Sequence, residues 1–291
     1  MINETLTLVI NGSQAIPLEV TTITKTNWIQ FGVTIAASAF FILWMLGQSI
    51  GEGIGKIISK VLIYSFKKAN KVKHLMVIKH TRSGMFDMSM INQETMRELQ
   101  EAMLKFKGEN FDLVLYTGGG EIFSSEFISR LLRSYKGKIR TFVPVYSMSG
   151  GTYLALSTNE IYMNDYSCLG AVDAQLGMLF GGMGSAKGWS EVIKLKKNKA
   201  NDQSIIMNLM GKQYTKTARQ EMDNLLLHHL PNSTQRKVFV DYITSGEVQH
   251  ALPLTKATLR SFGLKIKDID SETNTKLLKL LKGLKDGVTY G

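Results

Sequence analysis

A serine beside two glycines is the clearest candidate for chemistry in this chain. Ser149 follows an apolar run, and Gly150 and Gly151 come directly after it, ahead of the apolar segment 153–157. Small residues let the backbone turn sharply and leave a serine hydroxyl exposed above the start of a helix. Such a hydroxyl attacks a carbonyl carbon when a base stands within hydrogen-bond reach. The pattern therefore indicates a candidate nucleophile.

A second glycine-rich turn has the sequence Thr-Gly-Gly-Gly and covers Thr117 to Gly120. Placed between a strand and a helix, such a turn can direct backbone N–H groups at an anion, although most turns of this kind serve packing. The dinucleotide fingerprint and the Walker pattern are both missing, which disfavours a phosphate site. No cluster has the spacing of metal ligands, so neither a metal nor another cofactor is expected.

Alternating strands and helices must position these two turns. Strands are expected over 75–79, 111–116, 139–145 and 161–163, and helices over 93–106, 123–135, 153–157 and much of 188–239. Repeated strand–helix units predict an α/β domain over 74–291, with a mainly parallel sheet covered by helices. Such sheets place their sites at the carboxyl ends of the strands, where both turns lie.

Three segments, 111–120, 143–152 and 169–177, resemble motifs of the serine dehydrogenase proteinase family, which is related to signal peptide peptidase A and the Clp proteolytic subunit. The resemblance runs from about Leu75 to Leu264. It implies the Clp/crotonase fold and a serine endopeptidase, with Ser149 as the nucleophile. It also implies an oxyanion hole built from the backbone N–H groups of Gly120 and Gly150. The family usually has proline where this chain has Gly118, so we expect a looser loop.

The resemblance leaves two candidates for the general base. The Clp subunit uses a histidine that follows its serine, but this region here reads Asp173-Ala-Gln. Signal peptide peptidase A uses a lysine on a later helix, and Lys216 matches it, ahead of the neighbouring Lys212. His250 lies in a segment that resembles the family's histidine segment and is the second candidate. Asp173 either orients His250 or caps a turn.

An uncharged stretch near the amino terminus predicts a membrane anchor. Residues 27–51 carry no charge, and about 20 apolar residues suffice to span a bilayer as a helix. Only Lys25 precedes the stretch, whereas six lysines follow it between residues 52 and 73. Because lysines stay on the cytoplasmic side, we expect a single pass in a bacterial-type inner membrane, with the amino terminus outside and the domain cytoplasmic.

The flanking segments fit this topology. Residues 52–73 predict a basic helix on anionic headgroups, which explains part of the net charge of +11 and favours lipid over nucleic acid as the partner. Residues 1–26 form an extracytoplasmic segment in this topology, and Asn11-Gly12 is a typical hairpin turn within it.

The leading functional hypothesis is a membrane-anchored serine peptidase that acts on unfolded or membrane-derived polypeptides. The chain has no ATPase motif, so it is ATP-independent by itself, and energy-driven unfolding would need a separate ATPase or membrane partner. A homo-oligomer is implied by the resemblance. Two alternatives stay open, namely an inactive oligomeric scaffold or peptide-binding protein, and a crotonase-like enzyme that acts on an acyl-CoA thioester. The glycine- and methionine-rich segment 177–188 is either a cover over the site or an interface element.

Overall fold

The structure is a computed structural model that describes residues 6–8, 16–18, 34–35, 37–38, 40–42, 54–55, 57–68, 71–81, 89–177 and 183–291. It divides into two units, Met1–Ile54 and Gly55–Gly291.

In the first unit β1 (Leu6–Leu8) pairs antiparallel with β2 (Ile16–Leu18), and the Asn-Gly turn lies outside the described residues. Most of the predicted transmembrane segment, 27–51, also lies outside them. Within the described part, no helix is long and apolar enough to cross a membrane.

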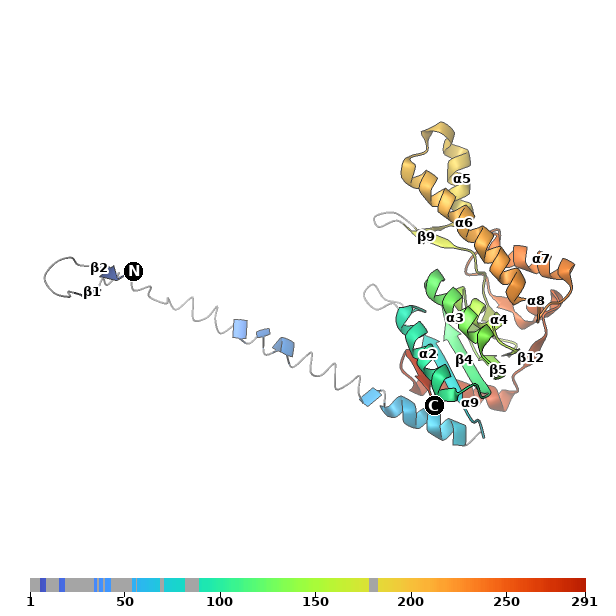
Figure 1. Cartoon of the computed structure of the whole chain (residues 1–291), viewed down its shortest axis with the longest axis horizontal. Helices are drawn as coiled ribbons and strands as arrows, with labels where there is room; N and C mark the ends of the chain where they lie inside the picture. Colours follow the sequence, from blue (N-terminus) through green and yellow to red (C-terminus); the bar gives the residue numbers. More distant parts are fainter. Residues whose placement is uncertain are drawn as a thin grey trace. The chain divides into compact units, whose positions relative to one another are not determined.

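The second unit is built on a nine-stranded sheet (Figure 1). Its strands are β3 (Leu75–His80), β4 (Phe111–Thr117), β5 (Ile139–Val143), β6 (Tyr146–Ser147), β7 (Glu160–Met163), β8 (Cys168–Leu169), β11 (Leu254–Thr255), β12 (Ile266–Asp268) and β13 (Gly287–Tyr290). The inner strands run parallel, whereas β13 pairs antiparallel with β3 and β11 pairs antiparallel with β8. The expected α/β architecture with a mainly parallel sheet is therefore confirmed.

Helices cover the sheet (Figure 1). They are α2 (Gln93–Phe106), α3 (Ile122–Ser134), α4 (Gly150–Leu156), α5 (Ala186–Lys196), the short η1 (Lys197–Lys199), α6 (Asp202–Leu225), α7 (Ser233–Thr244), α8 (Lys256–Ser261), α9 (Ser271–Gly283) and a helix over 57–68. Alternate side chains of β4 point to opposite faces. Leu113 and Leu115 enter the core formed with α2, α3 and α4, whereas Val114 enters the core formed with α9 and the 57–68 helix.

Several local details differ from the sequence-based expectation. Proline cannot donate a ladder hydrogen bond, and β5 ends at Val143, just before Pro144. The two-residue strand β6 then forms between Pro144 and the serine turn, and α4 begins at Gly150 rather than at residue 153. The last strand, β13, was not expected. A separate two-stranded sheet joins β9 (Gln175–Gly177) to β10 (Met183–Ser185), and residues 178–182 between them lie outside the description.

A cross-strand ion pair ties β4 to β5. Asp112 and Arg140 lie opposite each other in the parallel register, with 2.6 Å and 2.8 Å between the guanidinium nitrogens and the two carboxylate oxygens. Burial raises the pKa of the Asp112 carboxyl, and the hydrogen bond and charge of Arg140 oppose that shift. Because a buried carboxylate without its partner is costly, this pair matters to stability.

Replacing Arg140 with methionine is expected to lower the free energy of unfolding by about 3 kcal/mol, because the carboxylate of Asp112 stays buried and loses its cation. Urea denaturation of the variant measures this loss. Lys138→Met is the matched control, since it breaks a pair with Glu160 in which the lysine is 50% exposed, and it should cost less than about 1 kcal/mol. Equal losses in the two variants would contradict a special role for the Asp112 pair.

Candidate active site

The two glycine-containing turns leave the sheet side by side. Thr117 at the end of β4 pairs in parallel register with Ser147 at the end of β6. The backbone N–H of Met148 donates to the carbonyl oxygen of Thr117 over 2.9 Å. As a result, the segments that follow the two strands begin next to each other at the carboxyl edge of the sheet, where parallel sheets place their sites.

The backbone of Ser149 is strained. Its φ is 49° and its ψ is −118°, a conformation that L-residues rarely adopt, and it directly precedes the first residue of α4. The hydroxyl of Thr152 supports the turn from behind, because it donates to the carbonyl oxygen of Ser147 over 2.9 Å and accepts the N–H of Gly170 over 3.0 Å. A strand–turn–helix of this kind exposes the serine side chain at the carboxyl edge of the sheet.

The facing glycine turn packs directly against the serine turn. Gly119 has a φ of +105°, and a Cβ atom there would lie 2.7 Å from the Cβ of Ser149 and 2.9 Å from the nitrogen of Gly150. A Cβ atom on Gly150 would lie 3.4 Å from the nitrogen of Gly120 and 2.1 Å from the Oγ of Ser125. Only glycine allows these approaches, and they bring the two peptide nitrogens close together.

These two peptide groups are available to a ligand. In the backbone hydrogen bonds of the described residues, the N–H groups of Gly120 and Gly150 have no acceptor. Both residues line one cavity of about 600 Å³, together with Ser149. Converging N–H groups of this kind stabilise an oxyanion that develops on a carbonyl attacked by a nearby nucleophile.

The glycine turn is held in place on both sides of Gly118. The N–H of Gly119 donates to the hydroxyl of Thr117 over 3.1 Å, and its carbonyl accepts the N–H of Ile91 over 2.9 Å. The N–H of Glu121 returns a bond to the carbonyl of Ile91 over 2.8 Å. Gly118 itself is exposed, and a Cβ atom on it would meet nothing within 4 Å. The hydrogen bonds around Gly118 therefore hold the turn without a proline at that position.

A pair of alanine substitutions tests the glycine turn. Gly120→Ala places a Cβ atom 2.1 Å from the carbonyl oxygen of Ile91, so the peptide must shift. We expect a loss of about 10²- to 10³-fold in kcat for peptide hydrolysis, the effect of one lost oxyanion donor. Gly118→Ala, the control, has open space around it and should retain activity within about threefold. Equal activity of both variants would remove Gly120 from the oxyanion hole.

His250 lines the same cavity as Ser149, and a buried carboxylate holds it. The Nδ1 of His250 lies 2.7 Å from the Oδ1 of Asp173, whose side chain is 3% exposed. The Nε2 of Gln175 donates to the other carboxylate oxygen over 2.7 Å. A carboxylate beside Nδ1 favours the tautomer that carries its proton there, which leaves Nε2 as an acceptor. No hydrogen bond to Nε2 occurs within the described part of the chain.

The sheet explains why these two residues meet. Strands β8 and β11 run antiparallel, with Leu169 opposite Leu254. Asp173 follows Leu169 by four residues and His250 precedes Leu254 by four, so both side chains lie beyond the same end of the strand pair. The pairing joins residues that are 77 positions apart in the chain.

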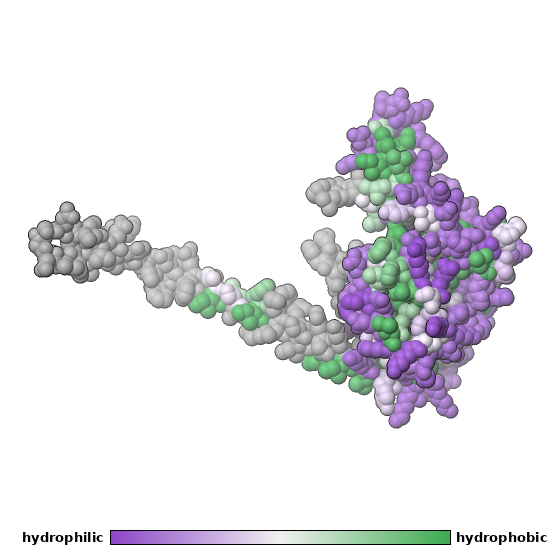
Figure 2. Space-filling view, in the orientation of Figure 1, coloured by the Kyte–Doolittle hydropathy of each residue, from purple (hydrophilic) through white to green (hydrophobic). Residues whose placement is uncertain are grey.

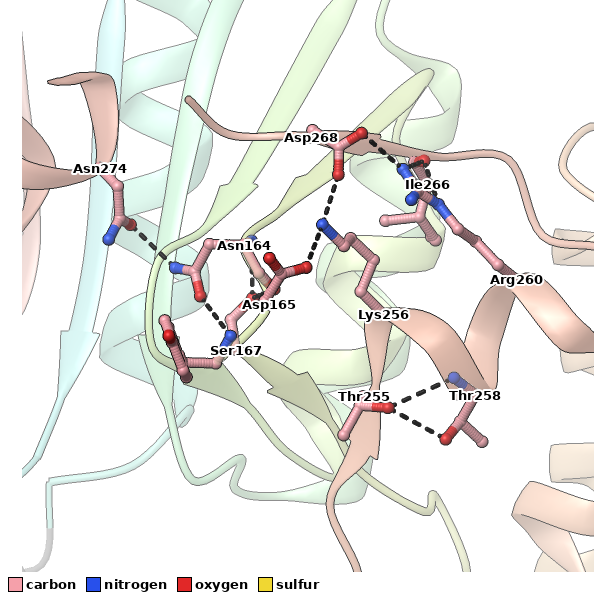
Figure 3. A network of polar contacts seen from close by, with 11 residues as sticks. Asn164, Asp165, Ser167, Thr255, Lys256, Thr258, Arg260, Ile266, Asp268 and Asn274 are labelled. Carbon is pink, nitrogen blue, oxygen red and sulfur yellow. Dashed lines mark hydrogen bonds and ion pairs between the residues drawn. The ribbon is translucent and has the colours of Figure 1, made fainter. Parts of the chain in front are cut away.

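A polar network holds the segment that follows β11 (Figure 3). The ammonium of Lys256 contacts Asp268 and lies 2.6 Å from Asp165. The guanidinium of Arg260 donates to the carbonyl oxygen of Ile266 over 2.7 Å and 3.0 Å, and also to Asp268. These contacts join α8 to β12 and to the turn after β7. They therefore fix the position of α8, which follows His250 and β11 in the chain.

Lys216 lies elsewhere. It is exposed on α6 and lines a second cavity together with Lys212, whereas the residues of α6 that line the Ser149 cavity are Tyr214 and Ala218. Residues 214 and 218 are one helical turn apart on one face, and residue 216 points away from that face. A lysine base needs burial to give up its proton at neutral pH. The structure does not bring Lys216 into the Ser149 cavity, and the geometry favours His250.

Comparisons with known proteins agree with this fold. The family model described as ClpP-like SDH-type serine proteinase matches residues 71–287. Two uncharacterized proteins of Methanocaldococcus jannaschii are similar to the chain, one at 26% identity with 86% of each chain covered. The other is 29% identical over 62% of this chain, which spans 60% of that relative.

Two solved structures are similar at a lower level. A membrane-bound stomatin-specific protease is 18% identical, with 66% of this chain and 79% of that chain covered and a TM-score of 0.45. ClpP1 from Listeria monocytogenes is 11% identical, with 68% and 94% covered and a TM-score of 0.42. The family match covers the strands of the sheet from β3 to β12, both glycine turns and His250, and by that match the chain belongs to the ClpP-like SDH-type serine proteinases.

Proposed function

We propose that this protein hydrolyses peptide bonds of unfolded or membrane-derived polypeptides through an acyl-enzyme on Ser149. One observation carries the proposal: the strained Ser149 shares a cavity with an imidazole that a buried carboxylate orients and with two peptide N–H groups that donate to no described residue. Membership of a serine proteinase family supports the same chemistry.

In the proposed reaction, Nε2 of His250 takes the proton of Ser149 as its Oγ bonds to the substrate carbonyl carbon. The N–H groups of Gly120 and Gly150 bind the resulting oxyanion. Collapse breaks the C–N bond, and His250 returns the proton to the leaving amine. Water then cleaves the ester by the same steps. Ser149 and His250 form no hydrogen bond with each other in the described structure. Hydrogen bonds between a nucleophile and its base are often long in the free enzyme and shorten only when substrate binds.

The test uses the full chain in detergent, with an unfolded protein such as casein as substrate and a tightly folded protein as control. We expect fragments from casein alone, because the chain carries no unfolding motor, and we expect a fluorophosphonate to stop the reaction. Intact casein after incubation with demonstrably folded enzyme would reject the peptidase proposal and leave the scaffold hypothesis.

We also propose that residues 27–51 anchor the protein in a bacterial-type inner membrane, with the amino terminus outside and the domain cytoplasmic. The helix over 57–68 supports this, because Ile57, Val61 and Tyr64 form an exposed apolar stripe while Ile63 is buried in the core with α9. Exposed lysines accompany the stripe, as an anionic lipid surface requires. Retention of the full chain in membrane pellets after alkaline carbonate extraction tests the anchor, and release into the supernatant would reject it.

A homo-oligomer belongs to the same proposal. Figure 2 shows apolar side chains gathered on the hairpin of α5 and α6, where Leu195 is 82% and Leu209 is 60% exposed. An exposed patch of this kind typically marks an interface, and a second copy of the chain would cover it. Light scattering of the Leu209→Asp variant should show smaller particles than the unaltered protein, and an unchanged mass would argue against this contact.

A further inference from the structure

The Ser149 cavity is acidic although the chain is basic. The chain has 35 lysines and arginines against 24 acidic residues. Among its described lining residues the cavity has three carboxylates, those of Glu121, Glu126 and Asp173, and no lysine or arginine. Asp173 is held by His250, and Glu121 accepts a hydrogen bond from Ser124 over 2.8 Å. Glu126 has neither a hydrogen bond nor an ion pair with any described residue.

A buried hydroxyl without a partner lines the same cavity. The side chain of Tyr153 is 7% exposed, and no described residue hydrogen-bonds to its hydroxyl. Burial raises the pKa of Tyr153, and the negative charges of Glu126 and Glu221 raise it further. A buried hydroxyl without a hydrogen-bond partner is costly. Its position near a carboxylate that also has no described partner indicates that a polar group of a bound ligand supplies the missing hydrogen bonds.

Arg130, the cation whose charge acts on Glu126, forms its ion pair with another carboxylate. Arg130 follows Glu126 by one turn of α3, but its guanidinium lies 2.9 Å from Glu221 and its side chain is 62% exposed. Burial raises the pKa of the Glu126 carboxyl, Glu221 raises it further, and the charge of Arg130 only partly opposes the shift. A cation that enters the cavity would therefore meet a carboxylate that no ion pair occupies.

Glu126 and Tyr153 flank the serine turn. Tyr153 follows Ser149 by four residues, about one turn of α4 and a rise of about 6 Å. The residue before Glu126 is Ser125, whose Oγ lies against the backbone of Gly150. Both side chains line the same cavity as Ser149, so a substrate side chain next to the cleaved bond would enter their surroundings if it is as long as lysine or arginine.

We propose that Glu126 and the Tyr153 hydroxyl form a subsite for a lysine or arginine side chain that flanks the bond cleaved at Ser149. The carboxylate accepts charge-assisted hydrogen bonds from the ammonium or guanidinium group, and the phenol oxygen accepts one more. Apolar lining residues such as Val172 and Ala218 pack against the methylene stem. The subsite rests on the proposed peptidase function and adds its substrate class.

The first test compares hydrolysis of two peptides that differ only in arginine or uncharged citrulline beside the cleaved bond. We expect Glu126→Gln to lower kcat/KM for the arginine peptide by about tenfold and to leave the citrulline peptide unchanged. Tyr153→Phe should reduce the preference by about two- to fivefold without lowering Tm, because the lost hydroxyl had no partner. Glu272→Gln removes an equal charge from α9, which contributes no lining residue, and should change nothing.

The second test does not depend on hydrolysis. Full-length Ser149→Ala protein in detergent is titrated with fluorescent unfolded peptides that carry arginine or citrulline. We expect the arginine peptide to bind about tenfold more tightly and Glu126→Gln to remove the difference. Equal affinities, or a difference that survives Glu126→Gln, would overturn the subsite. Retained discrimination in this binding assay, together with an unaltered protein that cleaves neither peptide, would reject the peptidase function alone.

Discussion

Replacing Ser149 with alanine should reduce peptide hydrolysis by about 10⁴-fold or more, because the Oγ atom that attacks the carbonyl carbon is removed. The fold should be unaffected. Alanine keeps the Cβ atom and is as strained as serine at a φ of 49°. The hydroxyl also forms no hydrogen bond with any residue that the structure describes. Initial rates on a fluorogenic peptide, with Tm measured on the same sample, check both statements.

Ser147→Ala is the matched control for this prediction. Ser147 lies two residues before the nucleophile, and its buried hydroxyl has no partner within the described residues. Removing that hydroxyl should therefore leave rate and stability nearly unchanged. A Ser149→Ala protein that keeps a tenth or more of the activity would mean that another group performs the attack.

His250→Ala is expected to lower kcat/KM by about 10³- to 10⁴-fold, whereas Lys216→Ala should retain activity within about threefold. The expectation follows from position. His250 lines the Ser149 cavity, and Asp173 fixes its ring, while Lys216 is exposed in another cavity. Steady-state kinetics of the two variants on one peptide, with circular dichroism to confirm folding, give the comparison.

The Asp173→Asn variant tests whether the carboxylate of Asp173 sets the tautomer and orientation of the His250 ring. An amide can donate to Nδ1 and favour the wrong tautomer, so this variant should fall well below the unaltered protein while His250 is intact. The opposite pattern, in which Lys216→Ala is inactive and His250→Ala is active, would restore the lysine mechanism that the resemblance suggested.

The sequence predicts the parts of this fold that depend on local order. Strand, glycine turn and helix follow one another without interruption around Thr117 and around Ser149, so periodicity and turn chemistry are sufficient to locate them. The sequence does not predict strand β13, because its four residues carry only a weak alternation of apolar and polar residues. Its partner in the sheet is β3, which lies near the start of the domain in the sequence. Strand β6 has two residues, too few for any periodic signal.

The site was harder to predict where it depends on long-range register. Asp173 and His250 meet only because β8 and β11 pair antiparallel across a long stretch of chain. Lys216 does lie on a helix, as expected, but the face that α6 turns to the cavity is set by packing, which the sequence does not show. Glu126 and Tyr153 look like ordinary helical residues in the sequence, and only the structure shows that both line the Ser149 cavity without a hydrogen-bond partner among the described residues.

The most direct measurement is covalent labelling of the full chain with a fluorophosphonate, followed by tandem mass spectrometry of the digested protein. Only a serine with an activated hydroxyl and an adjacent oxyanion hole reacts readily with such a probe. We expect one adduct per chain, on the peptide that contains Ser149, formed far more slowly in His250→Ala and absent in Ser149→Ala. A folded protein that forms no adduct, or forms it only on another residue, would contradict Ser149 as the nucleophile and favour an inactive scaffold or an acyl-CoA enzyme.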